Sequence, residues 1–174
     1  SADGRFLLYG VLNDPKTGTD LWGLPLTGDR QPFAWLNASY DERQGAFSPD
    51  GRWVAFGSNE SGRFEIYVRP FPGPSGAPPP PAALGAPASG TAGGQWQVST
   101  AGGIWARWRP DGKALYYIAP DGKLMAAPIA VNGTTLEPGA PVALFQTRIV
   151  GGGTNFGVGR QYDVAADGHF LINT

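Results

Sequence analysis

Apolar residues in this chain fall in short runs, which are separated by turns rich in glycine, proline and aspartate. Short runs enriched in Val, Ile, Tyr, Phe and Trp predict β-strands. No long window places apolar residues at helical spacing, so the pattern predicts an all-β chain. We expect 13 strands, over residues 6–12, 20–26, 31–36, 44–48, 53–58, 64–71, 95–99, 104–109, 114–119, 123–130, 142–148, 161–165 and 169–173.

One short motif, an Asp-Gly pair followed by an apolar strand, occurs four times. The copies are SADGRFLLY, SPDGRWVAF, RPDGKALYY and AADGHFLIN, and their Asp-Gly pairs are 47, 61 and 56 residues apart. Repeats of roughly 40 to 50 residues are typical of propeller blades and solenoids. The longest interval contains a Pro-rich, uncharged insertion at residues 72–94, which we expect to be an exposed loop between the third and fourth strands of the middle blade.

The Asp-Gly pair itself predicts a tight hairpin turn. Glycine adopts positive φ without steric cost and aspartate tolerates it. We expect each aspartate carboxylate to accept hydrogen bonds from the amides of its own turn. Asp121-Gly122 predicts a further turn of this kind between the second and third strands of the third repeat.

The strand that follows each turn is apolar on both of its faces. In residues 53–58, Val54 and Phe56 face one way and Trp53 and Ala55 the other. A sheet with one solvated face would alternate apolar and polar residues. Sheets covered on both faces occur in radially packed propeller blades, whereas solenoid repeats carry fewer strands. The pattern therefore favours a β-propeller of about three four-stranded antiparallel blades per chain.

Composition narrows the function classes. The net charge is −1 with no basic cluster, so we expect no nucleic-acid partner. Cysteine is absent, which excludes disulfides and thiolate chemistry. No apolar run approaches the ~20 residues of a membrane span, and the N-terminus does not resemble a signal peptide.

Residues 47–71, FSPDGRWVAFGSNESGRFEIYVRPF, resemble the repeat of TolB-like β-propellers, a bacterial class with a Pro-Asp-Gly turn. Residues 96–129 and 162–174 resemble the closing blades of propellers fused behind bacterial serine/threonine kinases. The resemblance implies a bacterial sensor or protein-interaction module and favours an extracytoplasmic or periplasmic location, but a fold does not identify a ligand. The sequence departs from the repeat at Ala2 and Ala166, which replace proline, and in the Pro-rich insertion.

The sequence offers little catalytic or metal-binding chemistry. His169 is the single histidine and directly follows a turn, so we expect a structural role and no enzyme activity. The turn aspartates lie in different blades, whereas calcium needs about six to eight converging oxygens, so we expect no metal. The glycine-rich run at 151–157 is not followed by a helix and predicts a loop, not a phosphate site. We therefore expect no cofactor.

A binding site is expected at one mouth of the propeller channel, where the loops entering the innermost strands meet. Aromatic and charged residues there suit a peptide or a small ligand, although the same residues also fit an ordinary rim. The candidates are Tyr40, Asp41, Arg43, Trp105, Arg107 and Trp108.

The chain has too few blades to close a ring, which needs about four to eight. We expect a single partial propeller with one blade at about 1–43, a second at 44–102, a third at 103–148 and closing strands at 161–174. It begins and ends at the second strand of a blade, so we predict a homodimer that forms one six-bladed ring. The predicted function is a non-catalytic ligand- or protein-binding scaffold. The alternatives are a gating propeller of a peptidase or hydrolase, a structural fragment, and blades supplied by a longer parent chain.

Overall fold

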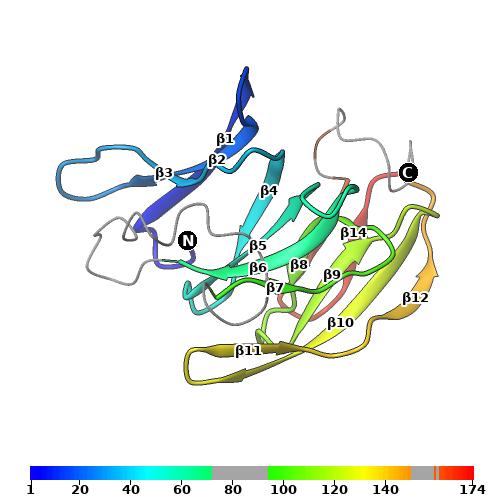
Figure 1. Ribbon diagram of the computed structural model, residues 1–174. Coiled ribbons are helices and arrows are strands. Elements are labelled where there is room, and N and C mark those ends of the chain that lie inside the picture. Colours follow the sequence, from blue (N-terminus) through cyan, green and yellow to red (C-terminus); the bar gives the residue numbers. More distant parts are fainter. Residues whose placement is uncertain (72–93, 150–158, 160) are drawn as a thin grey trace.

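The computed structural model describes residues 1–71, 94–149, 159 and 161–174. Within these ranges the chain forms 14 strands, all paired antiparallel, and no helix, so none of the described segments is a helix able to cross a membrane. The strands form small sheets that lie side by side in a row (Figure 1). This confirms the predicted all-β partial propeller. The run at 151–157 and nearly all of the Pro-rich insertion lie outside the described residues.

Each sheet corresponds to a whole or partial blade. The first contains β1 (Phe6–Asp14), β2 (Gly18–Pro25) and β3 (Phe33–Leu36), and the second contains β4 (Glu42–Phe47), β5 (Trp53–Ser58), β6 (Glu65–Pro70) and β7 (Trp96–Gln97). The third contains β8 (Ile104–Trp108), β9 (Ala114–Ile118), β10 (Lys123–Asn132) and β12 (Val142–Gln146), with β11 (Thr135–Pro138) paired to the far end of β10. A last hairpin joins β13 (Tyr162–Val164) to β14 (Phe170–Ile172).

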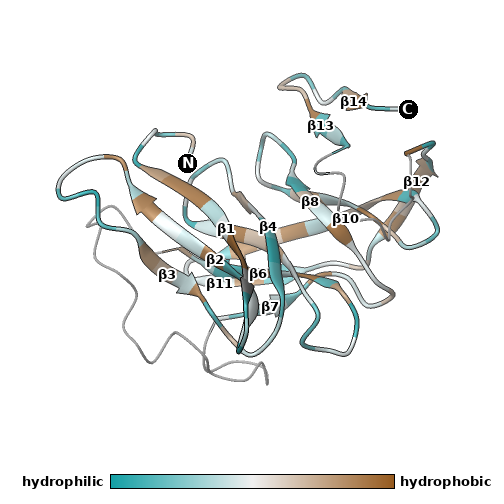
Figure 2. Ribbon diagram, turned by 90° about the horizontal axis from the view of Figure 1, so that it is seen from above, coloured by the Kyte–Doolittle hydropathy of each residue, from teal (hydrophilic) through white to brown (hydrophobic). Residues whose placement is uncertain are grey.

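The blades pack face to face through the doubly apolar strands. On β5, Val54 and Phe56 lie in a core cluster shared with the first blade, and Trp53 and Ala55 lie in a cluster shared with the third. All four are at most 3% exposed, which confirms that this strand is covered on both faces. Full burial of a valine or phenylalanine side chain, as at Val54 and Phe56, stabilises the fold by about 1.5–3 kcal/mol. Colouring by hydropathy shows apolar stretches on the strands and polar residues in the turns (Figure 2).

All five Asp-Gly turns have one geometry. The glycine N–H donates to the carbonyl three residues earlier at 2.8–3.1 Å. The aspartate Oδ1 accepts the N–H two residues later at 2.9–3.1 Å. The expected capping by the carboxylate is therefore confirmed. Only the glycines have positive φ, from 70° to 87°, so aspartate contributes its carboxylate and not a left-handed backbone.

Three strands, β7, β10 and β11, differ most from the sequence prediction. β10 continues to Asn132 and turns at Gly133, with φ 63°, into β11, a strand that the pattern did not indicate. Leu136 anchors β11 because its side chain is fully buried in the core between the second and third blades. β7 is only two residues long, because the Ser99 hydroxyl, and not a strand carbonyl, accepts the Ile66 N–H at 2.8 Å.

Candidate functional site

The loop that leads into β4 joins the first two blades. Asp41 Oδ1 accepts the Thr19 N–H at 2.8 Å, and the Asp41 N–H donates to Asn59 Oδ1 at 2.9 Å. Arg43 Nη2 lies 3.1 Å from Asp41 Oδ2. Tyr40 is 43% exposed. Of the predicted mouth residues on this loop, Asp41 and Arg43 are therefore brought together in a contact between blades, and Tyr40 alone presents a large aromatic surface to solvent.

Trp105 and Trp108, predicted at the channel mouth, are instead part of the core. They are 1% and 8% exposed. The Trp108 indole Nε1–H donates to the Ala46 carbonyl at 3.0 Å, and the Tyr162 hydroxyl donates to the Trp105 carbonyl at 2.7 Å. Because an innermost strand is covered by a neighbour on each face, both rings pack between blades and neither offers a face to a ligand.

The innermost strands of the second and third blades, β4 and β8, each contain a bulge. Gln44 and Trp105 have φ of 59° and 57°, and the strand register shifts beside each of them. The Trp105 N–H donates to Gln44 Oε1 at 3.1 Å, so the two bulges bond to each other across the blades. Bulges re-aim side chains and are common beside functional sites. The bulges could not be predicted from the sequence, because neither residue is a type that favours positive φ.

Arg107 connects the third blade to the last hairpin. Its Nε lies 3.6 Å from Asp163 Oδ1 on β13, and the Arg107 side chain is only 12% exposed. Arg107 also donates from Nη1 to the Ala106 carbonyl at 2.6 Å. Like Asp41, this predicted site residue contacts a neighbouring blade.

A buried carboxylate that the sequence did not single out lies at the start of β4. Glu42 is 1% exposed, and Oε2 has no hydrogen-bond partner among the described residues. Burial raises the pKa of Glu42 to about 8, and the carboxylates of Asp20 and Glu60 push it in the same direction. The Ala38 amide and the Arg69 guanidinium oppose the shift in this pKa. Glu42 is therefore protonated at neutral pH.

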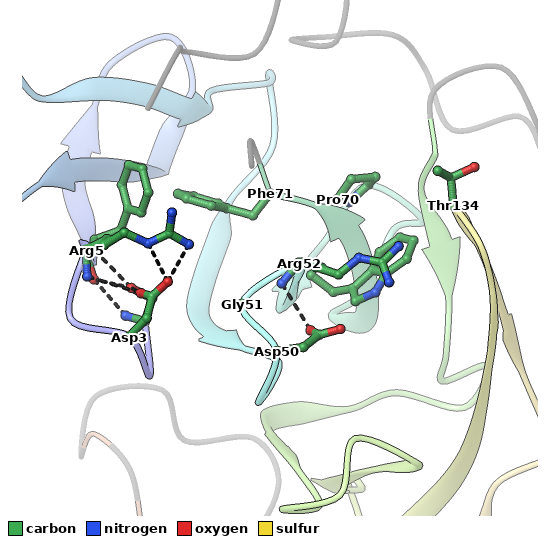
Figure 3. A pocket seen from close by; sticks show the side chains of 11 residues that line it. Asp3, Arg5, Asp50, Gly51, Arg52, Pro70, Phe71 and Thr134 are labelled. Carbon is green, nitrogen blue, oxygen red and sulfur yellow. Dashed lines mark hydrogen bonds and ion pairs between the residues drawn. The ribbon is translucent and has the colours of Figure 1, made fainter. Parts of the chain in front are cut away.

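A cavity of about 420 Å³ lies between the first two Asp-Gly turns (Figure 3). The two turns supply a carboxylate and a guanidinium each, and the ends of β5 and β6 supply apolar side chains. The lining residues are Ser1, Asp3, Arg5, Phe6, Asp50, Gly51, Arg52, Trp53, Pro70, Phe71 and Thr134. They come from four segments far apart in sequence, so no local pattern could have predicted the cavity.

The remaining candidate groups belong to the turns. Among the described residues, no three His, Asp or Glu side chains gather as metal ligands. The His169 side chain is 82% exposed, and its Nδ1 lies 2.9 Å from Asp167 Oδ2. Hydrogen bonds from His169 lower the pKa of Asp167. His169 thus pairs with the aspartate of its own turn.

No protein-family model and no curated protein matches the chain. Solved structures do match. A protein assigned as TolB from Agrobacterium tumefaciens has a TM-score of 0.53 and 16% identity, over 82% of this chain and 48% of that one. TolB from Acinetobacter baumannii has a TM-score of 0.52 and 17% identity, over 79% of this chain and 31% of that one. A puromycin-hydrolysing peptidase from Mycobacterium tuberculosis has a TM-score of 0.48 and 16% identity, over 81% and 22% of the two chains.

The chain spans less than half the length of each of these proteins. At such identities the likeness concerns the fold and not the activity. The blade order, the packing of doubly covered strands and the two TolB structures agree: this chain has the β-propeller fold seen in TolB.

Proposed function

We propose that the chain is a non-catalytic binding and scaffolding module, and that a second copy of the chain completes its propeller ring. The resemblance to kinase-linked propellers supports a sensor or protein-interaction role in a bacterial signalling protein, outside the cytoplasm. The observation that carries the proposal is a pair of uncovered apolar surfaces at the two ends of the row of blades.

The first surface is the outward face of the first blade. Strand register pairs Leu7 with Leu24 and Tyr9 with Trp22, and directly paired residues share a face of the sheet. Leu7 is 50% exposed and Val11, two pairs along the same face, is 36% exposed. On the opposite face of these strands, Phe6 and Leu21 are buried against the second blade, whereas Leu12 near the far end of β1 is 67% exposed. Contiguous exposed apolar residues of this kind mark an interaction surface.

The second surface lies at the other end, on the third blade and the last hairpin. Val142 and Phe145 on β12 are 55% and 42% exposed, and Leu171 on β14 is 67% exposed. Phe145 contacts Phe170, with ring centroids 5.8 Å apart, so the short hairpin covers part of the third blade. A hairpin of two strands leaves the rest of that face open, because a full blade would carry two more strands.

The strand order indicates how two copies would join. β1 and β14 each follow an Asp-Gly turn and so occupy the second position of a blade, and β13 occupies the first. Among the described strands, nothing pairs with the inner edge of β1. If β13 of one copy pairs with β1 of the other, β13 and β1–β3 make one complete blade and β14 is displaced. Two such seams related by a two-fold axis give a six-bladed ring.

Engineered cysteines test this exchange, because the natural chain has none. Within one chain, Asp163 on β13 pairs with Leu171 on β14. Leu7 and Leu171 are each the third residue after the glycine of an Asp-Gly pair. In the proposed exchange, Leu7 of one copy therefore takes the place of Leu171 opposite Asp163 of the other copy. Asp163→Cys and Leu7→Cys chains, mixed and oxidised, should therefore form a disulfide-linked dimer on non-reducing gels. Val131→Cys replaces Leu7→Cys as the control, because Val131 is similarly exposed, at 39%, but lies on the β10–β11 hairpin away from the predicted seam. A yield no higher than the control would refute the exchange.

A further inference from the structure

The cavity between the first two Asp-Gly turns has a rigid apolar floor. Phe6 and Phe71 pack edge to face with ring centroids 5.1 Å apart, and the Phe71 N–H donates to the Arg52 carbonyl at 2.8 Å. Trp53 and Pro70 are paired across β5 and β6. The volume, about 420 Å³, lies within the ~300–1,000 Å³ range of small-molecule sites. The floor is preformed, so a ligand would not have to order it.

Two arginines line this cavity, and only one is neutralised. The Arg5 side chain pairs with Asp3, with Nε 2.5 Å from Oδ2. Hydrogen bonds from the Ser1 hydroxyl and from Arg5 hold the pKa of Asp3 well below its usual range. Arg109, in the corresponding turn of the third blade, likewise makes two bonds of 2.7 Å to Asp111. These arginines have little charge left to offer a ligand.

Arg52 is turned away from its own aspartate. Asp50 Oδ1 accepts the Arg52 backbone N–H at 3.1 Å and the Ser48 hydroxyl at 2.5 Å, but not the guanidinium. The guanidinium instead donates from Nη2 to the Gly133 carbonyl at 2.5 Å and lies 5.8 Å from the centre of the Trp53 ring. Figure 3 shows its side chain extended along the cavity wall, above the turn that carries Asp50. Arg52 thus lines the cavity as a positive group that has no carboxylate partner among the described residues.

We propose that this cavity binds a small monoanionic carboxylate with a flat apolar body, and that Arg52 pairs with the carboxylate. A guanidinium has five N–H donors in a fork that matches a carboxylate, and the single bond to Gly133 leaves donors available. The aromatic floor fits the apolar body. Asp3 and Asp50 also line the cavity, so a dianion such as a phosphate monoester would be repelled where a monoanion is accepted. All of these residues belong to one chain, so the site does not depend on completion of the ring.

The test uses 3-phenylpropionate as the probe and its uncharged amide as the comparison. Titration of the ¹⁵N-labelled chain, followed by NMR of the Trp53 indole N–H and the Arg52 Nε–H, should show saturable shifts with the acid. The amide should bind about tenfold more weakly, because it forms no charge-assisted pair. No saturable shift with the acid, or equal affinities for acid and amide, would overturn the proposal.

Variants separate this role of Arg52 from a purely structural one. Arg52→Gln should abolish the preference for acid over amide, and Arg52→Lys should retain part of it because it keeps the charge. Arg109→Gln is the matched control, because Arg109 lies in the equivalent turn of the third blade and outside the cavity. Arg52→Lys keeps the test decisive if Arg52→Gln fails to fold. A preference that survives in Arg52→Gln, or is lost equally in Arg109→Gln, would refute a role for Arg52 in binding.

Discussion

Replacing Glu42 by glutamine should make the protein more stable at neutral pH, although Glu42 is buried in the seam between the first two blades. Burial holds the pKa of this carboxyl near 8 in the folded chain, against an ordinary value of 4.5. Between these values the unfolded chain is ionised at Glu42 while the folded chain keeps the proton. Folding then requires proton uptake, so the free energy of unfolding falls as pH rises through this window and levels off above pH 8.

The size of the effect follows from the width of the window. Within this pH window, Glu42 lowers the free energy of unfolding by about 1.4 kcal/mol for each pH unit. Between pH 5 and pH 7 the loss is therefore about 3 kcal/mol. Glutamine has nearly the same shape and stays neutral, so the Glu42→Gln variant lacks this loss. Asp20 and Glu60, whose pKa values are also raised by burial, add to the slope in both proteins. The difference between wild type and variant therefore isolates Glu42.

Urea denaturation followed by tryptophan fluorescence, from pH 5 to 7.5, measures both curves. Glu65→Gln is the matched control, and it should change the free energy of unfolding at pH 7 in the opposite direction. Glu65 is equally buried, at 1%, but its carboxylate pairs with Arg63 at 2.7 Å and accepts the Ser99 hydroxyl and the Gly102 N–H. Glu65→Gln should therefore destabilise the chain. Wild-type and Glu42→Gln curves that stay parallel across this range, or a Glu42→Gln variant less stable than wild type at pH 7, would refute the reasoning.

Three further predictions concern the turns and the insertion. Gly51→Ala should lower the free energy of unfolding, measured in urea, by about 1 kcal/mol, because φ is +70°. A Cβ at Gly51 meets no atom within 4 Å, so this loss comes from backbone strain alone. Gly10→Ala, where φ is not positive, should lower it little, and equal effects of the two substitutions would contradict this explanation. Deleting residues 75–91, a stretch without charge, should change Tm by only a few degrees in a thermal melt, and loss of folding would show that the segment packs. His169→Ala should leave every measured activity unchanged, and a hydrolase turnover that disappears with this substitution would contradict a non-catalytic chain.

Sequence patterns predicted the strands well where the signal was local. The alternation of Trp53, Val54, Ala55 and Phe56 correctly indicated a strand covered on both sides, because the period of two assigns each side chain to a face. The Asp-Gly pairs correctly indicated the turns, because glycine provides the positive φ that they need. β11 was missed because Leu136 is a single apolar residue among polar ones, and its burial depends on contact with another blade.

The candidate site was harder to predict, because the type of a residue does not determine how deeply it is buried in the fold. Trp105 was expected at the channel mouth, yet it is buried between blades. Glu42 stands in a charged run that is typical of an exposed loop, and only its burial and the nearby Asp20 carboxylate raise its pKa. Arg52 repeats the basic position of the other turns, and only the nearby β10–β11 hairpin draws it away from Asp50.

The central claim, a partial propeller completed by a second copy, is tested most directly by the mass of the folded chain in solution. Size-exclusion chromatography with light scattering at micromolar concentration should give twice the 18.3 kDa of one chain. The wild-type circular dichroism spectrum should be that of a β protein under the same conditions. A folded, monodisperse species with the mass of one chain would contradict the claim, and further blades of a longer polypeptide would then be the natural cover for the two apolar ends.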